Sequence, residues 1–151
     1  MTGLHVSNTF AFHLSEPREK VAPLFGAHKE RGWAEGWNPQ FLYPQPPEDI
    51  QGSVFQVAKS EGESTWITTI FDVERGHVQH VYFIPNVMAV LINIHLSPVN
   101  GSGTDVEVRY ERTALSAKMN DHIRDSGEQD AASADEWRAA IEKYFQRNVT
   151  R

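Results

Sequence analysis

The stretch SADEWRAAIEKYF, residues 133–145, carries the strongest local signal in the chain. Its apolar residues recur at the helical spacing i, i+3, i+4, i+7 and i+8, and they are Trp137, Ala140, Ile141, Tyr144 and Phe145. Ser133 and Glu136 form a capping-box pattern, so we expect the helix to begin there. Because the stripe is aromatic, it needs a large apolar partner surface, which a sheet would supply.

Strands precede this helix. Alternating apolar and polar residues predict strands over 5–14, 53–58, 65–73, 77–84, 87–97 and 104–115. From the second strand on, short turn-rich segments join each strand to the next, which is the pattern of hairpin loops and predicts an antiparallel meander.

Short helices are expected on both sides of the meander. Ser15 and Pro17 predict a first helix that ends at Gly26, with Ser15 as its cap, and a second covers 28–35. After the last strand, a short helix is expected to stop at Ser126-Gly127, ahead of the long helix.

Composition narrows the function classes. The 151 residues, 40% hydrophobic and 23% charged, predict one globular domain over 1–151. A net charge of −6 disfavours nucleic acid and anionic membranes as partners. Without cysteine, thiolate chemistry and disulfides are excluded. We expect no membrane insertion, no signal peptide and a cytoplasmic location.

The order of elements resembles the START-like superfamily, in its bacterial branch of polyketide cyclase/dehydrase and lipid-transport (SRPBCC) proteins. The residues that carry the resemblance are Phe12, Leu14, Ser15, Pro17, Val21, Ala22, Leu24, Phe25, Glu30, Arg31, Trp33, Ala34, Gly36, Trp37, Pro39, Gly52, Val54, Phe55, Thr65, Trp66, and the run Thr104, Val106, Val108, Tyr110, Thr113, Ala114, Leu115. These are apolar and turn residues that set a fold, and none is a catalytic signature.

The resemblance implies an α+β helix-grip fold. In it, a twisted antiparallel sheet of about six or seven strands wraps around a long C-terminal helix, with two short helices after the first strand. It also implies a cavity between sheet and helix. Members of the superfamily bind sterols, lipids, polyketides, plant hormones or phenolic compounds, and a minority are cyclases or dehydratases.

Aromatic side chains are the candidate walls of such a cavity. With the resemblance, the predicted pocket residues are Trp33, Trp37, Phe41, Trp66, His80, Tyr82, Tyr110, Trp137, Ile141 and Tyr144. The alternative is that these residues are packed core, and both roles can hold at once.

His80 and Tyr82 share one face of their strand and are the catalytic candidates, as an acid/base pair. Whether that face is the core side depends on the hairpin register around Pro85-Asn86, which the sequence leaves open. On the next strand the apolar alternation places Asn93 and His95 on the outer side if the apolar set faces the core.

Metal and cofactor sites are not expected. His77 and His80 lie three apart on a strand and point to opposite faces, so they cannot share an ion. No Gly-rich phosphate loop or Gly-x-Ser-x-Gly elbow occurs. The carboxylates Glu30, Glu35 and Asp72 have polar or turn neighbours and are expected in solvent.

Three functions remain open. The first is binding of a small hydrophobic, aromatic or lipid-like molecule. The second is a cyclase or dehydratase that uses a pocket histidine or tyrosine. The third is a protein-interaction module with a filled core. A homodimer is a further open alternative because sheet edges need cover.

Overall fold

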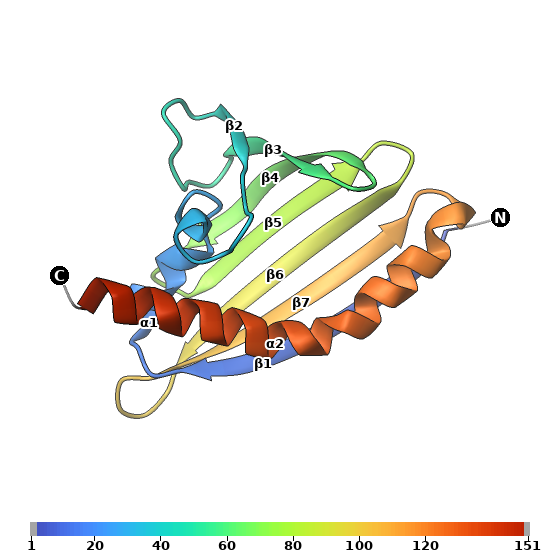
Figure 1. Cartoon of the computed structure of the whole chain (residues 1–151). Coiled ribbons are helices and arrows are strands. Elements are labelled where there is room, and N and C mark those ends of the chain that lie inside the picture. Colours follow the sequence, from blue (N-terminus) through green and yellow to red (C-terminus); the bar gives the residue numbers. More distant parts are fainter. Residues whose placement is uncertain (1–2, 150–151) are drawn as a thin grey trace.

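Seven strands form one antiparallel sheet in the computed structural model, which describes residues 3–149 (Figure 1). In space they follow the order β1-β7-β6-β5-β4-β3-β2. Their bounds are β1 His5–Leu14, β2 Gln40–Tyr43, β3 Val54–Lys59, β4 Gly62–Asp72, β5 His77–Ile84, β6 Met88–Pro98 and β7 Thr104–Ala114. The meander predicted from the alternation is therefore present, and β1 extends the sheet at one edge by pairing with β7.

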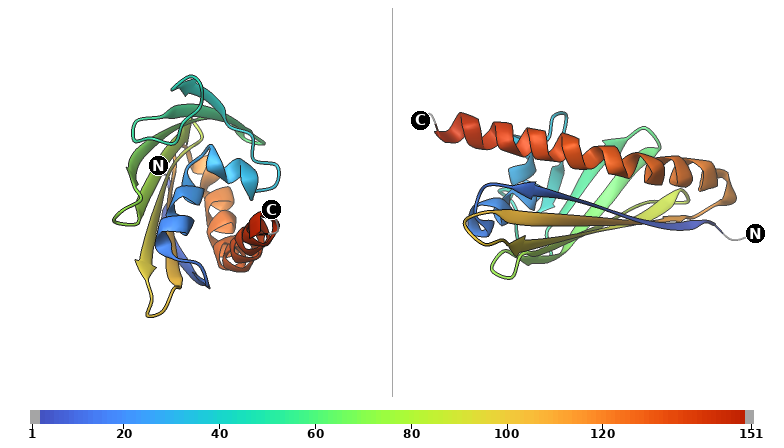
Figure 2. Two further views of the ribbon diagram at one scale, coloured as in Figure 1. Left: turned by 90° about the vertical axis from the view of Figure 1, so that its left-hand side faces the viewer. Right: turned by 90° about the horizontal axis from the view of Figure 1, so that it is seen from below.

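The helices lie before and after this meander. Between β1 and β2 come the short helix α1 (Arg18–Val21) and the 3₁₀ helices η1 (Ala22–Phe25) and η2 (Lys29–Gly32). After β7, η3 (Ala117–Met119) leads into α2 (Asn120–Val149), which packs mainly on β1 and less on β7. Figure 2 shows the sheet curled around α2, so the concave face of the sheet and the helix enclose the core.

Strict alternation places the core on the concave face. In β6, Met88, Val90, Ile92, Ile94 and Leu96 are buried, whereas the residues between them keep some exposure. Asn93 and His95 accordingly lie on the convex face. The hairpin register pairs Ile84 with Met88 and therefore turns His80 and Tyr82 to the concave side.

The expected break at Ser126-Gly127 is wrong, because α2 continues through it as one helix of 30 residues. Gly127 is buried against β1, where an added Cβ would lie 2.4 Å from Asn8 Nδ2 and 3.3 Å from Val6 Cγ1. The glycine thus permits close packing of helix on strand and is not a stop signal. The capping box expected at Ser133 is wrong for the same reason, since Ser133 lies inside the helix.

One smaller expectation also fails, and one element was missed. α1 is capped at Pro17 without a side-chain hydrogen bond, so Ser15 is not the cap. The short strand β2 was not expected, because its four residues are too few for periodicity to show.

Candidate functional site

A cavity of about 340 Å³ lies between the concave sheet face, the η2 region and α2. We call it the aromatic chamber, and its walls include Trp33, Trp37, Trp66, His80, Tyr110 and Trp137. All four tryptophans of the chain therefore line this one space. Its volume falls within the range of small-molecule sites.

The indole N–H groups hold three of these rings in place. Trp33 Nε1 donates to the Leu24 carbonyl at 2.8 Å, and Trp37 Nε1 donates to the Ala27 carbonyl at 2.7 Å. Trp66 Nε1 donates to the Ser64 hydroxyl at 2.8 Å. Because these donors are used by the protein, the three rings offer a ligand mainly apolar and π surface.

His80 faces the chamber but is locked by two hydrogen bonds. Its Nε2 lies 2.8 Å from the Phe25 carbonyl, and its Nδ1 lies 3.1 Å from the Thr68 hydroxyl. Because a carbonyl oxygen only accepts, Nε2 carries the proton and Nδ1 accepts from Thr68. Burial lowers the pKa of His80, although the bond to Phe25 and the charge of Asp49 oppose this. A neutral ring with both nitrogens engaged is suited to joining β5 to η1 and poorly suited to proton transfer.

The carboxylate of Glu30 was expected in solvent, and this expectation is wrong. Glu30 belongs to η2, lines the aromatic chamber and is half-buried. Burial raises the pKa of Glu30 well above its ordinary value, and the nearby charge of Asp49 raises it further. Asp49 itself accepts from the backbone N–H groups of His28 and Lys29 at 2.7 and 3.0 Å. No hydrogen-bond partner for the Glu30 carboxyl is found within residues 3–149, so it is available to a ligand.

A second cavity of about 290 Å³ adjoins the first, since Lys59, Trp66, Ile92 and Tyr110 line both. We call it the polar chamber, because its walls include Lys59, Glu61, Tyr82, Arg112, His122 and Asp130. It lies toward the first half of α2, which supplies His122 and Asp130.

A buried ion pair forms one wall of the polar chamber. Arg112 on β7 donates from both Nη atoms to the two carboxylate oxygens of Asp130 on α2, at 2.7 and 2.9 Å. Their side chains are 9% and 6% exposed. The guanidinium also lies 4.4 Å from the ring centroid of Tyr110. The pair satisfies two charges at once and ties the helix to the sheet.

Tyr82 stacks on Trp66 at 4.3 Å between ring centroids and reaches the polar chamber. Burial raises the pKa of Tyr82 to about 12. The phenol is therefore neutral near pH 7, and it can donate a hydrogen bond but is a poor base.

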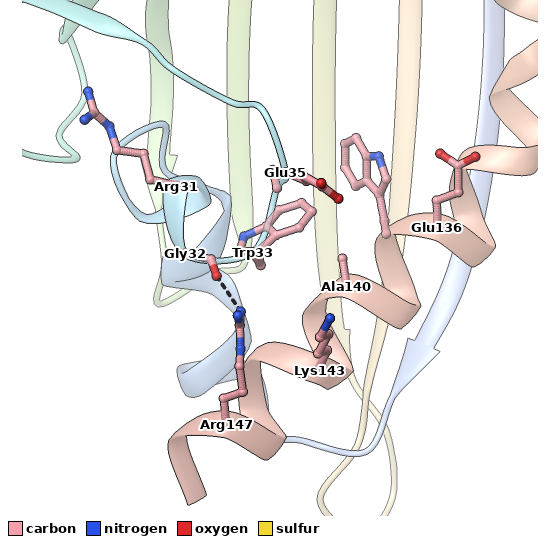
Figure 3. A pocket seen from close by; sticks show the side chains of 10 residues that line it. Arg31, Gly32, Trp33, Glu35, Glu136, Ala140, Lys143 and Arg147 are labelled. Atoms are coloured by element: carbon pink, nitrogen blue, oxygen red, sulfur yellow. Dashed lines mark hydrogen bonds between the residues drawn. The ribbon is translucent and has the colours of Figure 1, made fainter.

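A third, solvent-facing hollow of about 640 Å³ lies between η2 and the second half of α2. Figure 3 shows its charged rim, with Glu35 on one side and Lys143 and Arg147 on the other. Arg147 Nη2 donates to the Gly32 carbonyl at 2.9 Å. This outer groove adjoins the aromatic chamber, because Trp33, Ala34, Glu35 and Trp137 line both.

The structure brings together most of the residues predicted for the pocket. Trp33, Trp37, Trp66, His80, Tyr110 and Trp137 line the aromatic chamber, and Tyr82 lines the polar chamber. Three others are placed elsewhere. Phe41 lies behind Phe55, to which it stacks at 5.2 Å, Ile141 is fully buried, and Tyr144 packs near Gly32. None of these three lines the aromatic or the polar chamber.

Sequence reasoning missed Glu30 and Lys59. Strand alternation from Phe55 through Val57 signals that Lys59 faces inward. Glu30 gives no such signal, because it sits in a 3₁₀ turn between two charged residues.

Within the described part of the chain, no group of three or more His, Asp or Glu side chains is arranged to hold a metal ion. His77 stacks on His95 at 4.2 Å on the convex face, away from His80.

The sheet order and the long helix across the concave face match many solved structures. An uncharacterised protein from Rhizobium leguminosarum aligns with a TM-score of 0.66 and 13% identity, over 94% of this chain and 97% of its own. Norcoclaurine synthase from Thalictrum flavum, in complex with dopamine and hydroxybenzaldehyde, aligns with a TM-score of 0.66 and 9% identity. The alignment covers 94% of this chain and 89% of the synthase chain. Ara h 8.0201 aligns with a TM-score of 0.64 and 14% identity, over 95% of this chain and 99% of its own.

The chain has the START-like helix-grip fold. The resemblance found in the sequence is thereby confirmed at the level of fold, and identities this low carry nothing beyond it. No protein-family model matches the sequence, and no curated protein matches it significantly. Across residues 3–149 of this START-like chain, no helix combines the length and apolarity needed to span a membrane.

Proposed function

We propose that this protein binds a small aromatic molecule in the aromatic chamber. The observation that carries the proposal is the convergence of all four tryptophans on one cavity that also holds the unpartnered carboxyl of Glu30. The aromatic walls supply apolar area, and the carboxyl supplies one directional contact. A structural neighbour that holds dopamine and hydroxybenzaldehyde is consistent with this class of ligand.

A cavity of this kind favours ligand binding over an interaction module with a filled core. The proposal keeps the broader expectation of a hydrophobic ligand and narrows it to a ring system. Flat rings suit the space because the faces and edges of Trp33, Trp37 and Trp66 bound it.

Native mass spectrometry of the freshly purified protein, followed by the same sample denatured, tests the proposal. We expect a mass above that of the chain that is lost on denaturation and that corresponds to an aromatic compound. If only aliphatic lipids are ever released, or if added aromatic compounds never bind at millimolar concentration, the proposal is wrong.

A second candidate function is acid/base catalysis on the bound molecule. Glu30 favours it, because an unpartnered carboxyl with a raised pKa in an apolar cavity is the usual setting of a general acid or base. Glu30 replaces His80 and Tyr82 as the candidate, since His80 has both nitrogens engaged.

The two candidate functions differ in what co-purifies with Glu30→Gln. An enzyme releases its product and leaves unconverted substrate in the variant, so the trapped masses differ between wild type and variant. A binding protein carries the same molecule in both. Glu19→Gln, on the exposed face of α1, is the matched control.

A further inference from the structure

Lys59 stands where the aromatic and polar chambers meet. It is the last residue of β3, and alternation from Phe55 and Val57 turns its side chain to the concave face. It lines both chambers. Its Nζ lies 5.2 Å from the ring centroid of Tyr82 and 5.8 Å from that of Trp66. The ammonium is therefore held over aromatic faces, a weakly attractive cation–π arrangement.

The ammonium has no anionic partner in the described residues. No carboxylate oxygen of residues 3–149 lies within 4.0 Å of it, and no hydrogen bond from it is found there. The two acids of the polar chamber contact other groups, since Asp130 accepts from Arg112 and Glu61 lies 3.4 Å from His122.

The surroundings penalise this unpaired charge. Burial lowers the pKa of Lys59, the charge of Arg112 lowers it further, and Glu61 only partly opposes both. A half-buried ammonium without an anionic partner is costly, and an anion at hydrogen-bond distance would reduce that cost.

Two neutral donors line the same chamber as the ammonium. Tyr82 and Tyr110 line the polar chamber, and burial raises the pKa of both phenols, so each keeps its proton near pH 7. No protein acceptor for either hydroxyl is found in the part of the chain that the structure describes. One cation and two hydroxyl donors that line one chamber match an acidic oxygen group on the ligand.

We propose that the bound molecule is a small aromatic acid, whose ring system occupies the aromatic chamber and whose anionic group pairs with Lys59 at the junction with the polar chamber. This inference rests on the proposed function and specifies its ligand class. Lys59 sets the orientation of the ligand and selects acids over uncharged analogues of the same shape.

Two probes that differ by one anionic group test this. N-phenyl-1-naphthylamine is uncharged, and 8-anilinonaphthalene-1-sulfonate has the same ring system with a sulfonate. Both are titrated by fluorescence into the wild type, Lys59→Met and the control Lys20→Met, which removes an exposed lysine of α1.

We expect Lys59→Met to weaken binding of the sulfonate by roughly tenfold or more, the loss of one charge-assisted hydrogen bond. Binding of the uncharged probe should change less than about twofold, and Lys20→Met should leave both unchanged. Equal losses for both probes, or no loss for the sulfonate, would overturn the assignment of Lys59.

If the proposed function is wrong, neither probe binds the wild type, and this result is distinct from the failure of the Lys59 assignment. Thermal unfolding of Lys59→Met distinguishes a misfolded variant from an informative one. We expect its melting temperature to equal or exceed that of the wild type, since methionine keeps the apolar stem and removes a half-buried charge. A second variant, Lys59→Arg, should retain selectivity for the sulfonate.

Discussion

The two chambers share a wall but differ in which of their polar groups have partners. In the aromatic chamber, three indole N–H groups and both nitrogens of His80 bond to the protein, while the carboxyl of Glu30 does not. In the polar chamber, Arg112 and Asp130 satisfy each other, while Lys59 has no anionic partner in residues 3–149. The partnered groups join helix, sheet and short helices, whereas Glu30 and Lys59 keep polar atoms that no described residue bonds.

The largest effect is expected from breaking the Arg112–Asp130 pair. Arg112→Met leaves Asp130 buried and uncompensated, so we expect a loss of about 3–5 kcal/mol in the free energy of unfolding. Urea denaturation measures it. The double variant Arg112→Met, Asp130→Leu should recover most of the loss, because no buried charge is left. A single variant that costs less than about 1 kcal/mol would place the pair among ordinary surface ion pairs.

The next effect is expected at His80, the partnered group of the aromatic chamber. His80→Gln should lower the free energy of unfolding by roughly 1–3 kcal/mol at pH 8, because the carbonyl of Phe25 and the hydroxyl of Thr68 lose a matched partner. Binding of N-phenyl-1-naphthylamine to the folded variant should persist.

The pH dependence sharpens the same prediction. The pKa of His80 is lowered on folding, so the unfolded chain binds a proton first, and the wild type loses stability as the pH falls below about 6.5. This loss should be absent in His80→Gln and retained in His13→Gln, which changes an exposed histidine of β1. Unchanged stability with abolished binding would instead make His80 a ligand contact.

The smallest effect, of opposite sign, is expected at Glu30. Folding raises the pKa of Glu30, so the folded state holds the proton more tightly than the unfolded chain does. The carboxyl therefore lowers the stability of the protein as the pH rises from 4.5 through the raised pKa of the folded state. Glu30→Gln should therefore raise the free energy of unfolding by about 1–2 kcal/mol at pH 8. This gain in stability should vanish below pH 4.5. Melting curves across this range check it. A loss of stability at pH 8 would mean that Glu30 is a structural group.

Much of the fold could be predicted from the sequence, because it rests on local periodicity. The alternation over 77–84 predicted the bounds of β5, and the stripe from Trp137 to Phe145 predicted the second half of α2. The continuity of α2 through Gly127 could not be predicted, since it depends on contact with β1.

The site was predicted less completely than the fold. The aromatic walls followed from residue type and the fold resemblance, and Trp33, Trp66 and Trp137 do line one cavity. Glu30 was missed because its surroundings come from segments distant in sequence, including Asp49 and Trp137. The side of the sheet on which His80 lies depends on the hairpin register, and a one-residue slip of that register would move His80 to the other side.

The tryptophans themselves allow the most direct test of the aromatic chamber as a binding site. Because Trp33, Trp37, Trp66 and Trp137 all line the aromatic chamber, intrinsic fluorescence reports on its occupancy. Titration with N-phenyl-1-naphthylamine should quench that fluorescence saturably, with one probe bound per chain. Quenching that stays linear in probe concentration, or stoichiometry that exceeds one without saturation, would contradict the claim that this chamber is a binding site.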